Sequence, residues 1–293
     1  MRVGLVGLGT MGGRIAAQLA AGGEDLVVWD AEPDLVDGVY AESPETITAA
    51  DSPSAVAISA DVVLLSLPAP PEVAQVVTGD AGLLAVEAPR AICDLSTVDP
   101  DTTRALAARA GEAGAAYLDA PVLGRPPGCG SWTLPVGGSA QAVETVRPVL
   151  SHLANRIVHV GDVGSGNALK LVNNLMLGAI NGITVECLTM ADRAGLDPQV
   201  LYDTIAESGA ASVSNLFLEI GPKITAGDTS PQFTLDLLAK DNELALAMGR
   251  SVEMPLVVGG AVQTLNQLGR DRGLGGLDTS ALTRLYASQE EER

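Results

Sequence analysis

A single lysine stands in an apolar stretch at residues 164–174 (GSGNALKLVNN), which ends in two asparagines. If this stretch is helical, Lys170 and Asn174 are four residues apart and lie on the same face of the helix. Apolar neighbours such as Leu169 and Leu171 keep water from the ammonium group, which disfavours its charged form and lowers its pKa. Such a lysine can exchange a proton near neutral pH. The residues therefore predict Lys170 as a general acid or base and Asn174 as its partner.

The same residues are compatible with a structural arrangement, in which the lysine extends its head group to water and the amides cap helix ends. The scarcity of lysine bears on this choice, because the chain has three lysines against fourteen arginines. A second lysine, Lys240, lies in the block 233–241 (FTLDLLAKD), where it could also be an ordinary charge on a helix. From the residues alone, both interpretations of Lys170 remain open.

A glycine-rich turn follows the first apolar run of the chain, at residues 2–6. Its pattern is G-x-G-x-x-G, and it opens a helical pattern. In such a turn the first glycine permits a tight bend, the second admits a pyrophosphate and the third lets helix and strand pack closely. The predicted cofactor-binding residues are Gly7, Leu8, Gly9, Thr10, Met11 and Gly12. A glycine turn can also be a simple structural corner, so the motif depends on its context.

That context includes Asp30, at the end of the second predicted strand. A carboxylate there accepts hydrogen bonds from both ribose hydroxyls and repels a 2′-phosphate, so it predicts NAD rather than NADP. The alternative is a helix cap or a turn residue. Leu67, Pro68 and Thr97 follow later strands, at the edge where such sheets bind ligands. We include them as cofactor-binding candidates, although ordinary turns explain their spacing equally well.

The elements that must position these residues change in character along the chain. Strands are expected at residues 2–6, 25–30, 61–67, 90–95, 116–121, 133–137 and 156–160, and helices at 10–21, 101–113 and 140–153. This alternation predicts an α/β protein with a Rossmann-type, doubly wound sheet at residues 1–162. An all-helical domain is expected at 163–293, with helices at 167–194 and 235–250, the latter started by Ser230-Pro231. The tail at 289–293 is expected to be disordered.

Composition excludes several classes of protein. The net charge of −19 disfavours a nucleic-acid partner, because it repels phosphate backbones. We expect no membrane partner and a cytoplasmic location, because we predict no apolar run both long and unbroken enough to span a bilayer and no signal peptide at the start of the chain. The three cysteines, Cys93, Cys129 and Cys187, have no metal-ligand spacing, so no metal is expected. Either a high-salt habitat or GC-rich codon usage accounts for the acidic, lysine-poor composition.

Taken together, these blocks resemble the β-hydroxyacid dehydrogenase family, which includes 3-hydroxyisobutyrate dehydrogenase and tartronate semialdehyde reductase. The matching blocks are residues 7–12, 94–97 (DLST), 119–122 (DAPV), 164–174, 233–241 and 273–282. The resemblance implies an oxidoreductase that transfers a hydride between NAD and a short β-hydroxyacid or its semialdehyde. It implies that Lys170 exchanges the proton, Asn174 orients the substrate, Thr97 lies beside the nicotinamide and Lys240 closes over the cofactor. It also implies a homodimer or homotetramer built through the helical domain.

One block departs from the family pattern. The family usually has serine after Asp-Ala-Pro-Val, where its hydroxyl and the following glycines hold the substrate carboxylate, whereas this chain has Leu123. We hypothesise that Arg125 replaces the lost hydrogen bond by a bidentate contact. The predicted substrate-binding residues are Val122, Leu123, Gly124, Arg125 and Asn174. In the alternative, Arg125 points to solvent and Leu123 with Trp132 shapes a more apolar pocket.

Three competing functions remain to be compared. A dehydrogenase that uses histidine is disfavoured, because His152 and His159 lie outside every motif. Imine reductases share the expected architecture but typically lack the catalytic lysine. A non-catalytic cofactor-binding module would also tend to lose it. The presence of Lys170 therefore favours an active dehydrogenase over both.

Overall fold

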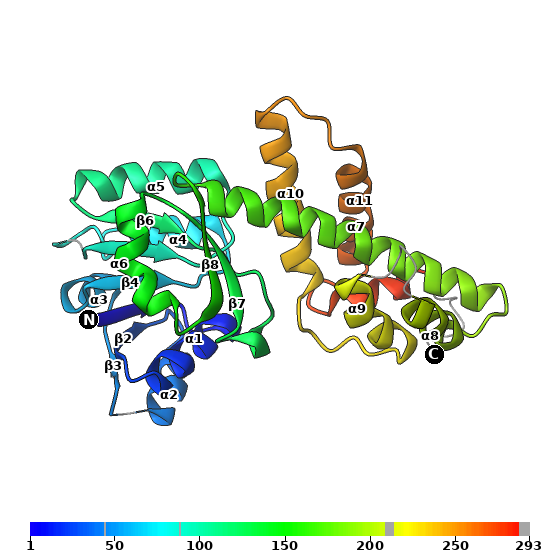
Figure 1. Cartoon of the computed structure of the whole chain (residues 1–293), viewed down its shortest axis with the longest axis horizontal. Helices are drawn as coiled ribbons and strands as arrows, with labels where there is room; N and C mark the ends of the chain where they lie inside the picture. Colours follow the sequence, from blue (N-terminus) through cyan, green and yellow to red (C-terminus); the bar gives the residue numbers. More distant parts are fainter. Residues whose placement is uncertain (44, 88, 209–213, 287–293) are drawn as a thin grey trace. The chain divides into compact units, whose positions relative to one another are not determined.

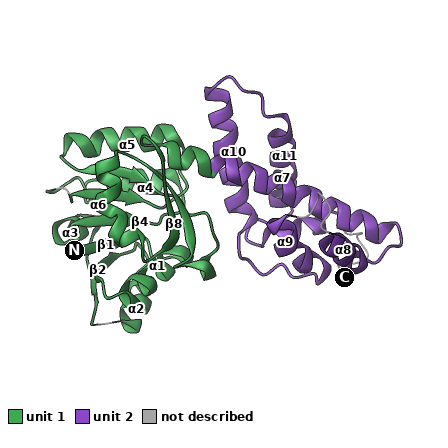
Figure 2. Ribbon diagram, in the orientation of Figure 1, with its two compact units in different colours: residues 1–170 green, residues 171–293 purple. Residues whose placement is uncertain are grey.

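The computed structural model describes residues 1–43, 45–87, 89–208 and 214–286, so the tail predicted to be disordered lies outside the described residues. The chain divides into two compact units, residues 1–170 and residues 171–293 (Figure 2). The division falls inside a long helix, whose first turns belong to unit 1. The domain boundary expected at 162/163, which would assign the whole helix to the second domain, stays a prediction.

Unit 1 contains an eight-stranded sheet in the order β3-β2-β1-β4-β5-β6-β7-β8 (Figure 1). Its strands are β1 (Arg2–Val6), β2 (Asp25–Trp29), β3 (Ile47–Ala49), β4 (Val62–Leu65), β5 (Ala91–Asp94), β6 (Ala116–Asp119), β7 (Trp132–Gly137) and β8 (Ala154–Gly161). Neighbouring strands are parallel except for β6 and β7, which are antiparallel. The predicted mainly parallel, doubly wound sheet is therefore confirmed.

The central strands are apolar on both faces because helices cover both sides of the sheet. In β4, Val62 and Leu64 point into one core and Val63 and Leu65 into the other, and all four side chains are fully buried. This alternation is the period-two geometry of a strand. A run of consecutive apolar residues therefore gives a strand with two buried faces, and the carboxyl ends of the strands are left to carry polar loops.

The helices of unit 1 divide between these two faces (Figure 1). The residues of α1 (Thr10–Ala21) and α6 (Ala140–Leu150) pack into the first core, with α2 (Pro33–Glu42) at its margin. The residues of α3 (Pro53–Ser59), α4 (Pro70–Thr78) and α5 (Pro100–Glu112) pack into the second. A short 3-10 helix, η1 (Pro126–Gly128), lies in the loop after β6.

Several of these helices begin at side-chain caps. Ser52, Asp99 and Ser139 each accept a hydrogen bond from the N–H three residues further on, and so start α3, α5 and α6. Helix α1 differs, because its N-cap is Gly9 and no side chain in the described residues caps it. Its first N–H groups are thus available to another acceptor.

Among its described residues, unit 2 consists of helices joined by loops, with one isolated β-bridge between Thr234 and Asp278, which confirms the predicted fold class. Its elements are α7 (Ser165–Arg193), which begins in unit 1, α8 (Pro198–Ser208), α9 (Asn215–Thr225), α10 (Leu235–Ser251), α11 (Val257–Asp271) and the 3-10 helix η2 (Thr279–Leu285). Helices α7, α10 and α11 approach closely at glycines, since a Cβ on Gly178 of α7 would lie 2.8 Å from Asn242 and 3.0 Å from Val262.

Three details differ from the sequence-based expectations. Strand β3 was not anticipated, because three residues at a sheet edge are too few for a periodic pattern. Helix α10 does begin at Leu235, but its cap is Thr234 rather than Ser230, which lies in the preceding loop. Helix α7 has the length and mean hydropathy (1.3) of a membrane span, against the expectation that no segment has both. The core helix of a soluble protein has the same properties, and 44% of the apolar 18-residue segment of α7 is buried.

Candidate active site

The glycine-rich turn between β1 and α1 has different requirements at its three glycines. Gly7 adopts a φ of +95°, and a Cβ there would lie 2.2 Å from the Ser66 carbonyl oxygen. A Cβ on Gly12 would lie 1.9 Å from the Gly7 carbonyl oxygen. Protein packing therefore demands glycine at both positions. A Cβ on Gly9 would meet no described atom within 4 Å, so the space beside Gly9 is open to a ligand.

The N-terminus of α1 fits the pyrophosphate of a dinucleotide. Its first turn carries no acidic residue, and Gly9 leaves the N–H groups of the first turn without a side-chain acceptor among the described residues. Helix N-termini carry a partial positive charge and unpaired N–H groups, which together favour an anion. Thr10 is exposed and Met11 half-buried, so this end of the helix is accessible. The predicted cradle is thus consistent with dinucleotide binding on both steric and electrostatic grounds.

Asp30 is connected to the glycine-rich turn by a direct hydrogen bond. Its Oδ2 accepts from the Leu8 N–H at 2.6 Å, and its Oδ1 accepts from the Glu32 N–H at 2.9 Å. A carboxylate oxygen can accept more than one hydrogen bond, so both oxygens retain capacity for ribose hydroxyls. The turn-residue role considered for Asp30 is present in the structure, and it is compatible with a cofactor role.

The loops after β4 and β5 are joined by a buried polar chain. The Ser96 Oγ accepts from the Leu67 N–H at 2.9 Å, and Asp94 Oδ1 accepts from the Ser96 N–H at 2.9 Å. Asp94 Oδ2 also accepts from the Tyr117 hydroxyl at 3.2 Å. Burial raises the pKa of the Asp94 carboxyl to about 6, although the hydrogen bonds from Ser96 and Tyr117 oppose this rise. The candidates Leu67 and Thr97 therefore lie on two loops that are fixed to each other, and Pro68 follows Leu67.

The loop after β6 carries the predicted substrate residues, and Lys170 reaches it. The Lys170 Nζ donates to the Val122 carbonyl oxygen at 2.8 Å. Leu123 forms an antiparallel bridge to Thr133, with N–H to carbonyl distances of 3.0 and 3.3 Å. Val122 is buried, whereas Leu123 and Arg125 are half-buried and Gly124 is exposed. Lys170 and the predicted substrate loop are thus brought together within unit 1.

Trp132 packs against this loop and donates a hydrogen bond to it. It is 2% exposed, its indole N–H donates to the Arg125 carbonyl oxygen at 2.8 Å, and its ring lies against Gly124. A Cβ on Gly124 would lie 2.3 Å from the ring, so glycine is required there. Trp132 belongs to the buried core of unit 1, and the alternative in which it shapes an apolar pocket with Leu123 stays a prediction.

The start of α7 is fixed by a buried carboxylate. Asp119, at the end of β6, accepts from the Gly164 N–H through Oδ1 and from the Asn167 N–H through Oδ2, both at 2.7 Å. Burial raises the pKa of Asp119, and these N–H groups act in the opposite direction. A carboxylate at a helix N-terminus also interacts favourably with the helix dipole. Asp119 thereby anchors the helix turn that precedes Lys170.

The remaining candidates lie in unit 2 and share one carboxylate. Asn174 is 1% exposed, and its Nδ2 donates to Asp241 Oδ2 at 2.5 Å. The Lys240 ammonium pairs with Asp241 Oδ1 at 2.9 Å. Asn173 Nδ2 donates to Asn174 Oδ1 at 3.0 Å, which fixes the orientation of the Asn174 amide. Asp241 therefore joins Asn174 of α7 to Lys240 of α10.

Sequence reasoning assigned no role to four polar residues that hold this arrangement, Asp94, Asp119, Asn167 and Asp241. All four are at most 2% exposed. The available signal was position, because Asp94 and Asp119 each end an apolar strand, where a buried acid needs a specific partner. Asp241 and Asn167 gave no such signal, since polar residues on a helix usually face water.

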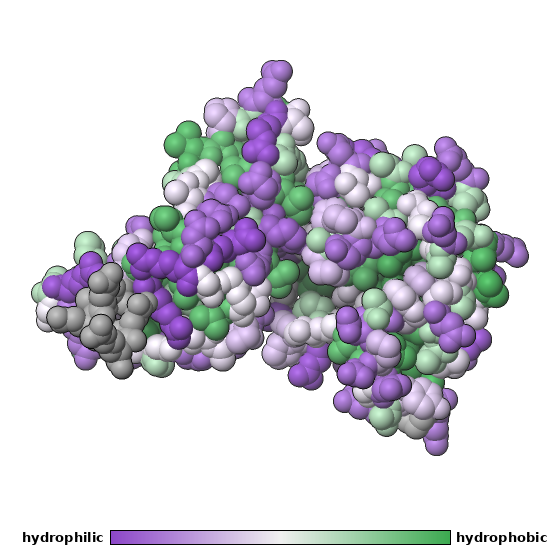
Figure 3. Space-filling model, turned by 180° about the vertical axis from the view of Figure 1, so that it is seen from behind, coloured by the Kyte–Doolittle hydropathy of each residue, from purple (hydrophilic) through white to green (hydrophobic). Residues whose placement is uncertain are grey.

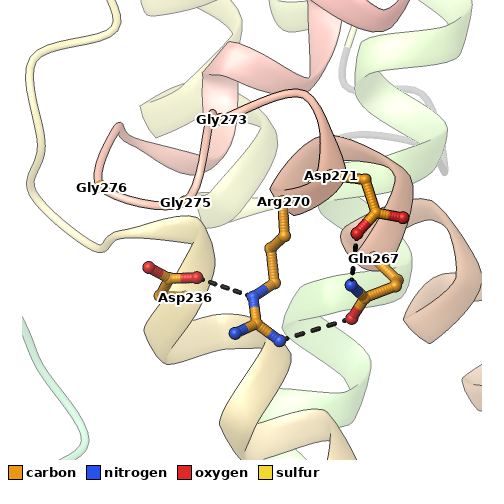
Figure 4. Close-up of a pocket in the computed structure, with 7 residues that line it drawn as sticks. All are labelled: Asp236, Gln267, Arg270, Asp271, Gly273, Gly275 and Gly276. Carbon is orange, nitrogen blue, oxygen red and sulfur yellow. Dashed lines mark hydrogen bonds and ion pairs between the residues drawn. The ribbon is translucent and has the colours of Figure 1, made fainter.

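A separate polar pocket of roughly 390 Å³ lies in unit 2 (Figure 4). Arg270 points toward Asp236, to which its Nε donates at 2.7 Å, and Gln267 Nε2 donates to Asp271 at 2.7 Å. The pocket is lined by Asp236, Gln267, Arg270, Asp271, Gly273, Gly275 and Gly276. The polar side chains of this pocket form hydrogen bonds with one another, and the lining includes none of the predicted site residues.

Comparison with known proteins supports the interpretation of both halves of the chain. Residues 2–161 match a family described as the NAD binding domain of 6-phosphogluconate dehydrogenase. Residues 164–286 match one described as the NAD-binding domain of NADP-dependent 3-hydroxyisobutyrate dehydrogenase.

Whole-length relatives have the same character. The chain is 34% identical to 2-(hydroxymethyl)glutarate dehydrogenase of Eubacterium barkeri, over 98% of this chain and 95% of that protein. It is 34% identical to 3-hydroxyisobutyrate dehydrogenase of Pseudomonas aeruginosa, over 98% and 99%. The solved structure of Mycobacterium tuberculosis 3-hydroxyisobutyrate dehydrogenase with L-serine superposes with a TM-score of 0.86, at 28% identity, over 98% and 100% of the two chains. The chain therefore belongs to the β-hydroxyacid dehydrogenase family, and it is an oxidoreductase that uses a nicotinamide dinucleotide to act on hydroxyacids.

Proposed function

We propose that the protein interconverts a short β-hydroxyacid of the 3-hydroxyisobutyrate type and its semialdehyde, with Lys170 as the general acid or base. The observation that carries this proposal is the hydrogen bond of 2.8 Å from the Lys170 Nζ to the carbonyl oxygen of Val122. This contact places the ammonium group at the loop whose residues we expect to bind the substrate. The same hydrogen bond supports a defined position for the Lys170 ammonium group.

The proposed reaction divides its chemistry between cofactor and protein. The bound nicotinamide supplies the hydride acceptor or donor, and the protein supplies position and the proton. In oxidation, a bound oxidised cofactor would accept the hydride released when the C–H bond at the hydroxyl-bearing carbon breaks. The hydroxyl proton passes to the neutral amine of Lys170, which leaves a carbonyl, the reduced cofactor and an ammonium group. In reduction, Lys170 returns this proton to the carbonyl oxygen.

The proposed preference for NAD rests on Asp30 at the end of β2. Its carboxylate would accept hydrogen bonds from the ribose hydroxyls and would repel a 2′-phosphate. Glu32, the next charged residue, adds a second negative charge. We expect kcat/KM to be at least about tenfold higher with NAD⁺ than with NADP⁺, the ratio that roughly 1.4 kcal/mol produces. Equal values for the two cofactors would contradict the assigned role of Asp30.

The substrate carboxylate is proposed to bind at the loop that carries Arg125. The backbone carbonyl oxygen of Arg125 accepts a hydrogen bond from the Trp132 indole N–H, so the position of Arg125 in the loop is defined. The Arg125→Ala variant should raise KM for the hydroxyacid by about tenfold or more while it leaves the Kd for NADH unchanged, since a charge-assisted hydrogen bond contributes about 1.5–3 kcal/mol. Arg125→Lys should restore only part of the affinity, because lysine cannot form a bidentate contact. An unchanged KM in Arg125→Ala would refute this assignment.

The central experiment is a substrate panel monitored by absorbance of the reduced cofactor. The panel contains 3-hydroxyisobutyrate, 3-hydroxypropionate, 2-(hydroxymethyl)glutarate, serine, glycerate and 3-hydroxybutyrate, each with NAD⁺ and NADP⁺. Lys170→Met retains the length of the side chain and removes the amine. We expect turnover of at least one panel member, its loss by about 10²-fold or more in Lys170→Met, and unchanged NADH binding. Wild-type turnover by Lys170→Met would refute the proton-transfer role.

We further propose a cytoplasmic homodimer or homotetramer built through the helical unit. Met176, Ile183 and Met190 of α7 are 62%, 55% and 67% exposed and follow one another at intervals of seven residues, so they lie on one face of the helix. Figure 3 shows one side of the molecule, on which green, hydrophobic residues reach the surface. The double variant Met176→Glu/Ile183→Glu should dissociate the oligomer in light scattering after size-exclusion chromatography. An unchanged mass would place any interface elsewhere.

A further inference from the structure

Asn167 lies where three segments of unit 1 meet. It is the third residue of α7 and is fully buried. Its N–H donates to Asp119 at the end of β6. Its Oδ1 accepts from the Val98 N–H at 3.2 Å, and its Nδ2 donates to the Thr103 Oγ1 of α5 at 3.1 Å. Asn167 therefore ties the first turn of α7 to residues that are 48, 69 and 64 positions away in the chain.

The orientation of the Asn167 amide is dictated by its partners. The Val98 N–H can only donate, so the atom that faces it must be the amide oxygen. The Thr103 hydroxyl donates to the Asp99 carbonyl oxygen at 3.0 Å, so it presents a lone pair to the amide nitrogen. Both assignments agree. If the amide were rotated by 180°, its NH₂ group would face the Val98 N–H, so that two donors would meet without an acceptor. The side chain is thus held in one orientation by complementary contacts.

The two ends of this bridge carry the proposed chemistry. Val98 directly follows Thr97, which we expect beside the nicotinamide, and Lys170 lies one helical turn after Asn167. The helix cannot adjust freely on its own, because a Cβ on Gly166 would lie 2.6 Å from the Pro135 carbonyl oxygen. This close approach fixes the distance of the helix from the sheet. The Asn167 amide then fixes its position relative to the Thr97 loop.

We propose that Asn167 is a positioning residue that holds Lys170 in register with the Thr97 loop, so that proton transfer and hydride transfer act on the same carbon–oxygen bond. This inference rests on the proposed role of Lys170. It assigns Asn167 no contact with substrate or cofactor, since the side chain is fully buried between protein groups. Its contribution is geometric, and displacements of about 1 Å at an active site can lower a rate by about 10²-fold.

The test compares Asn167→Leu, which removes both side-chain hydrogen bonds at similar volume, with Thr103→Val, which removes the acceptor of one. Thr145→Val is the matched control, because Thr145 of α6 also donates to the carbonyl four residues back at 3.0 Å but lies outside the Asn167 contacts. With 3-hydroxyisobutyrate as substrate, we expect kcat to fall by about 10–100-fold in Asn167→Leu, with KM and the Kd for NADH within about threefold of wild type. Thr103→Val should show a smaller loss in the same direction.

Isotope effects separate positioning from folding. A misplaced proton donor slows the chemical step, so the effect of substrate deuteration on kcat should increase in Asn167→Leu, and D₂O should lower kcat further. A merely structural role would reduce the folded fraction, seen by circular dichroism, and leave the isotope effect and the pH profile of the remaining activity at wild-type values. That result would overturn the proposal.

A second measurement needs no turnover. Acetic anhydride acylates neutral amines, and the chain has only three lysines, so peptide mass spectrometry can follow Lys170 with Lys223 as an internal reference. If Asn167 holds the Lys170 turn, the ratio of the two acylation rates should change by at least about threefold in Asn167→Leu and stay constant in Thr145→Val. A constant ratio in both variants contradicts the proposal. Turnover that survives in Lys170→Met would instead overturn the proposed function, while the acylation ratio still tests the role of Asn167.

Discussion

The open space beside Gly9 leads to a prediction that separates ligand binding from folding. In the Gly9→Ala variant the new methyl group meets no described atom within 4 Å, and the φ of −60° at this position is accessible to alanine. Alanine is a poorer N-cap than glycine but restricts the unfolded chain, so the two effects oppose each other. The free energy of unfolding should therefore stay within about 1 kcal/mol of wild type. The methyl group would instead occupy the space needed by the pyrophosphate.

The Gly12→Ala variant provides the contrast, because its Cβ would lie 1.9 Å from the Gly7 carbonyl oxygen. The turn would have to move by more than 1 Å to reach a normal contact of about 3.5 Å, which should cost about 1–3 kcal/mol or more of stability. Gly38→Ala on α2 is the control, since its Cβ also meets no described atom within 4 Å and lies away from the turn.

The assay pairs urea unfolding with fluorescence titration of NADH. Gly9→Ala should weaken NADH binding by at least about tenfold, or roughly 1.4 kcal/mol, at wild-type stability. Gly12→Ala should lose both stability and binding, and Gly38→Ala neither. If Gly9→Ala binds NADH as tightly as wild type, or is destabilised as much as Gly12→Ala, the assignment of the open space to the cofactor is refuted.

Three further predictions follow from buried groups. The pKa of Asp94 is raised from 3.8 to about 6 in the folded state, so folding takes up a proton between pH 3.8 and about 6. The free energy of unfolding should therefore decrease by about 3 kcal/mol as pH rises through this window. Urea titrations should show that this pH dependence is largely absent in Asp94→Asn. Gly124→Ala should lower the free energy of unfolding by about 1–3 kcal/mol and alter the fluorescence of Trp132, whose ring lies 2.3 Å from the added Cβ. Burial raises the pKa of the Cys93 thiol, so iodoacetamide should modify this residue only after unfolding, and modification in the native state would contradict its burial.

Much of the fold could be predicted from the sequence because its elements are long and strongly patterned. Helix α1 was expected at residues 10–21 and is found there, since a glycine turn and an apolar stripe define it. Strand β3 was missed because three residues carry no periodic pattern, and the cap of α10 was misplaced because Ser230-Pro231 is a start signal of the same kind as Thr234. Periodicity also failed at Asn181, Asn242 and Asn266, which are at most 1% exposed in the helical unit. An amphipathic pattern would place apolar residues at such positions.

Candidates for the proposed site could be identified from the sequence where the chemistry of a single side chain is itself informative. Lys170 stood out because it is one of three lysines and lies in an apolar stretch. Asn167 and Asp119 could not be identified in this way, because their importance depends on partners that are distant in sequence, such as Val98 and Gly164. Hydrogen bonds between separated segments leave no local signature in a single sequence. The Trp132 ring requires glycine at position 124, and this requirement could likewise be recognised only in the three-dimensional structure.

The bond between Asp30 and the Leu8 N–H constrains how this enzyme could acquire a new cofactor preference. If Asp30 repels a 2′-phosphate as proposed, a change that admits NADP must remove its negative charge, yet Leu8 is buried and its N–H would then lose its acceptor. An unpaired buried donor costs about 1–3 kcal/mol, so alanine at this position would loosen the turn that is proposed to bind the cofactor. A gradual route would pass through a short polar residue such as serine or asparagine and add a basic group at Glu32. Cofactor choice in this chain is therefore coupled to the stability of its first turn, which restricts the order in which such changes could accumulate.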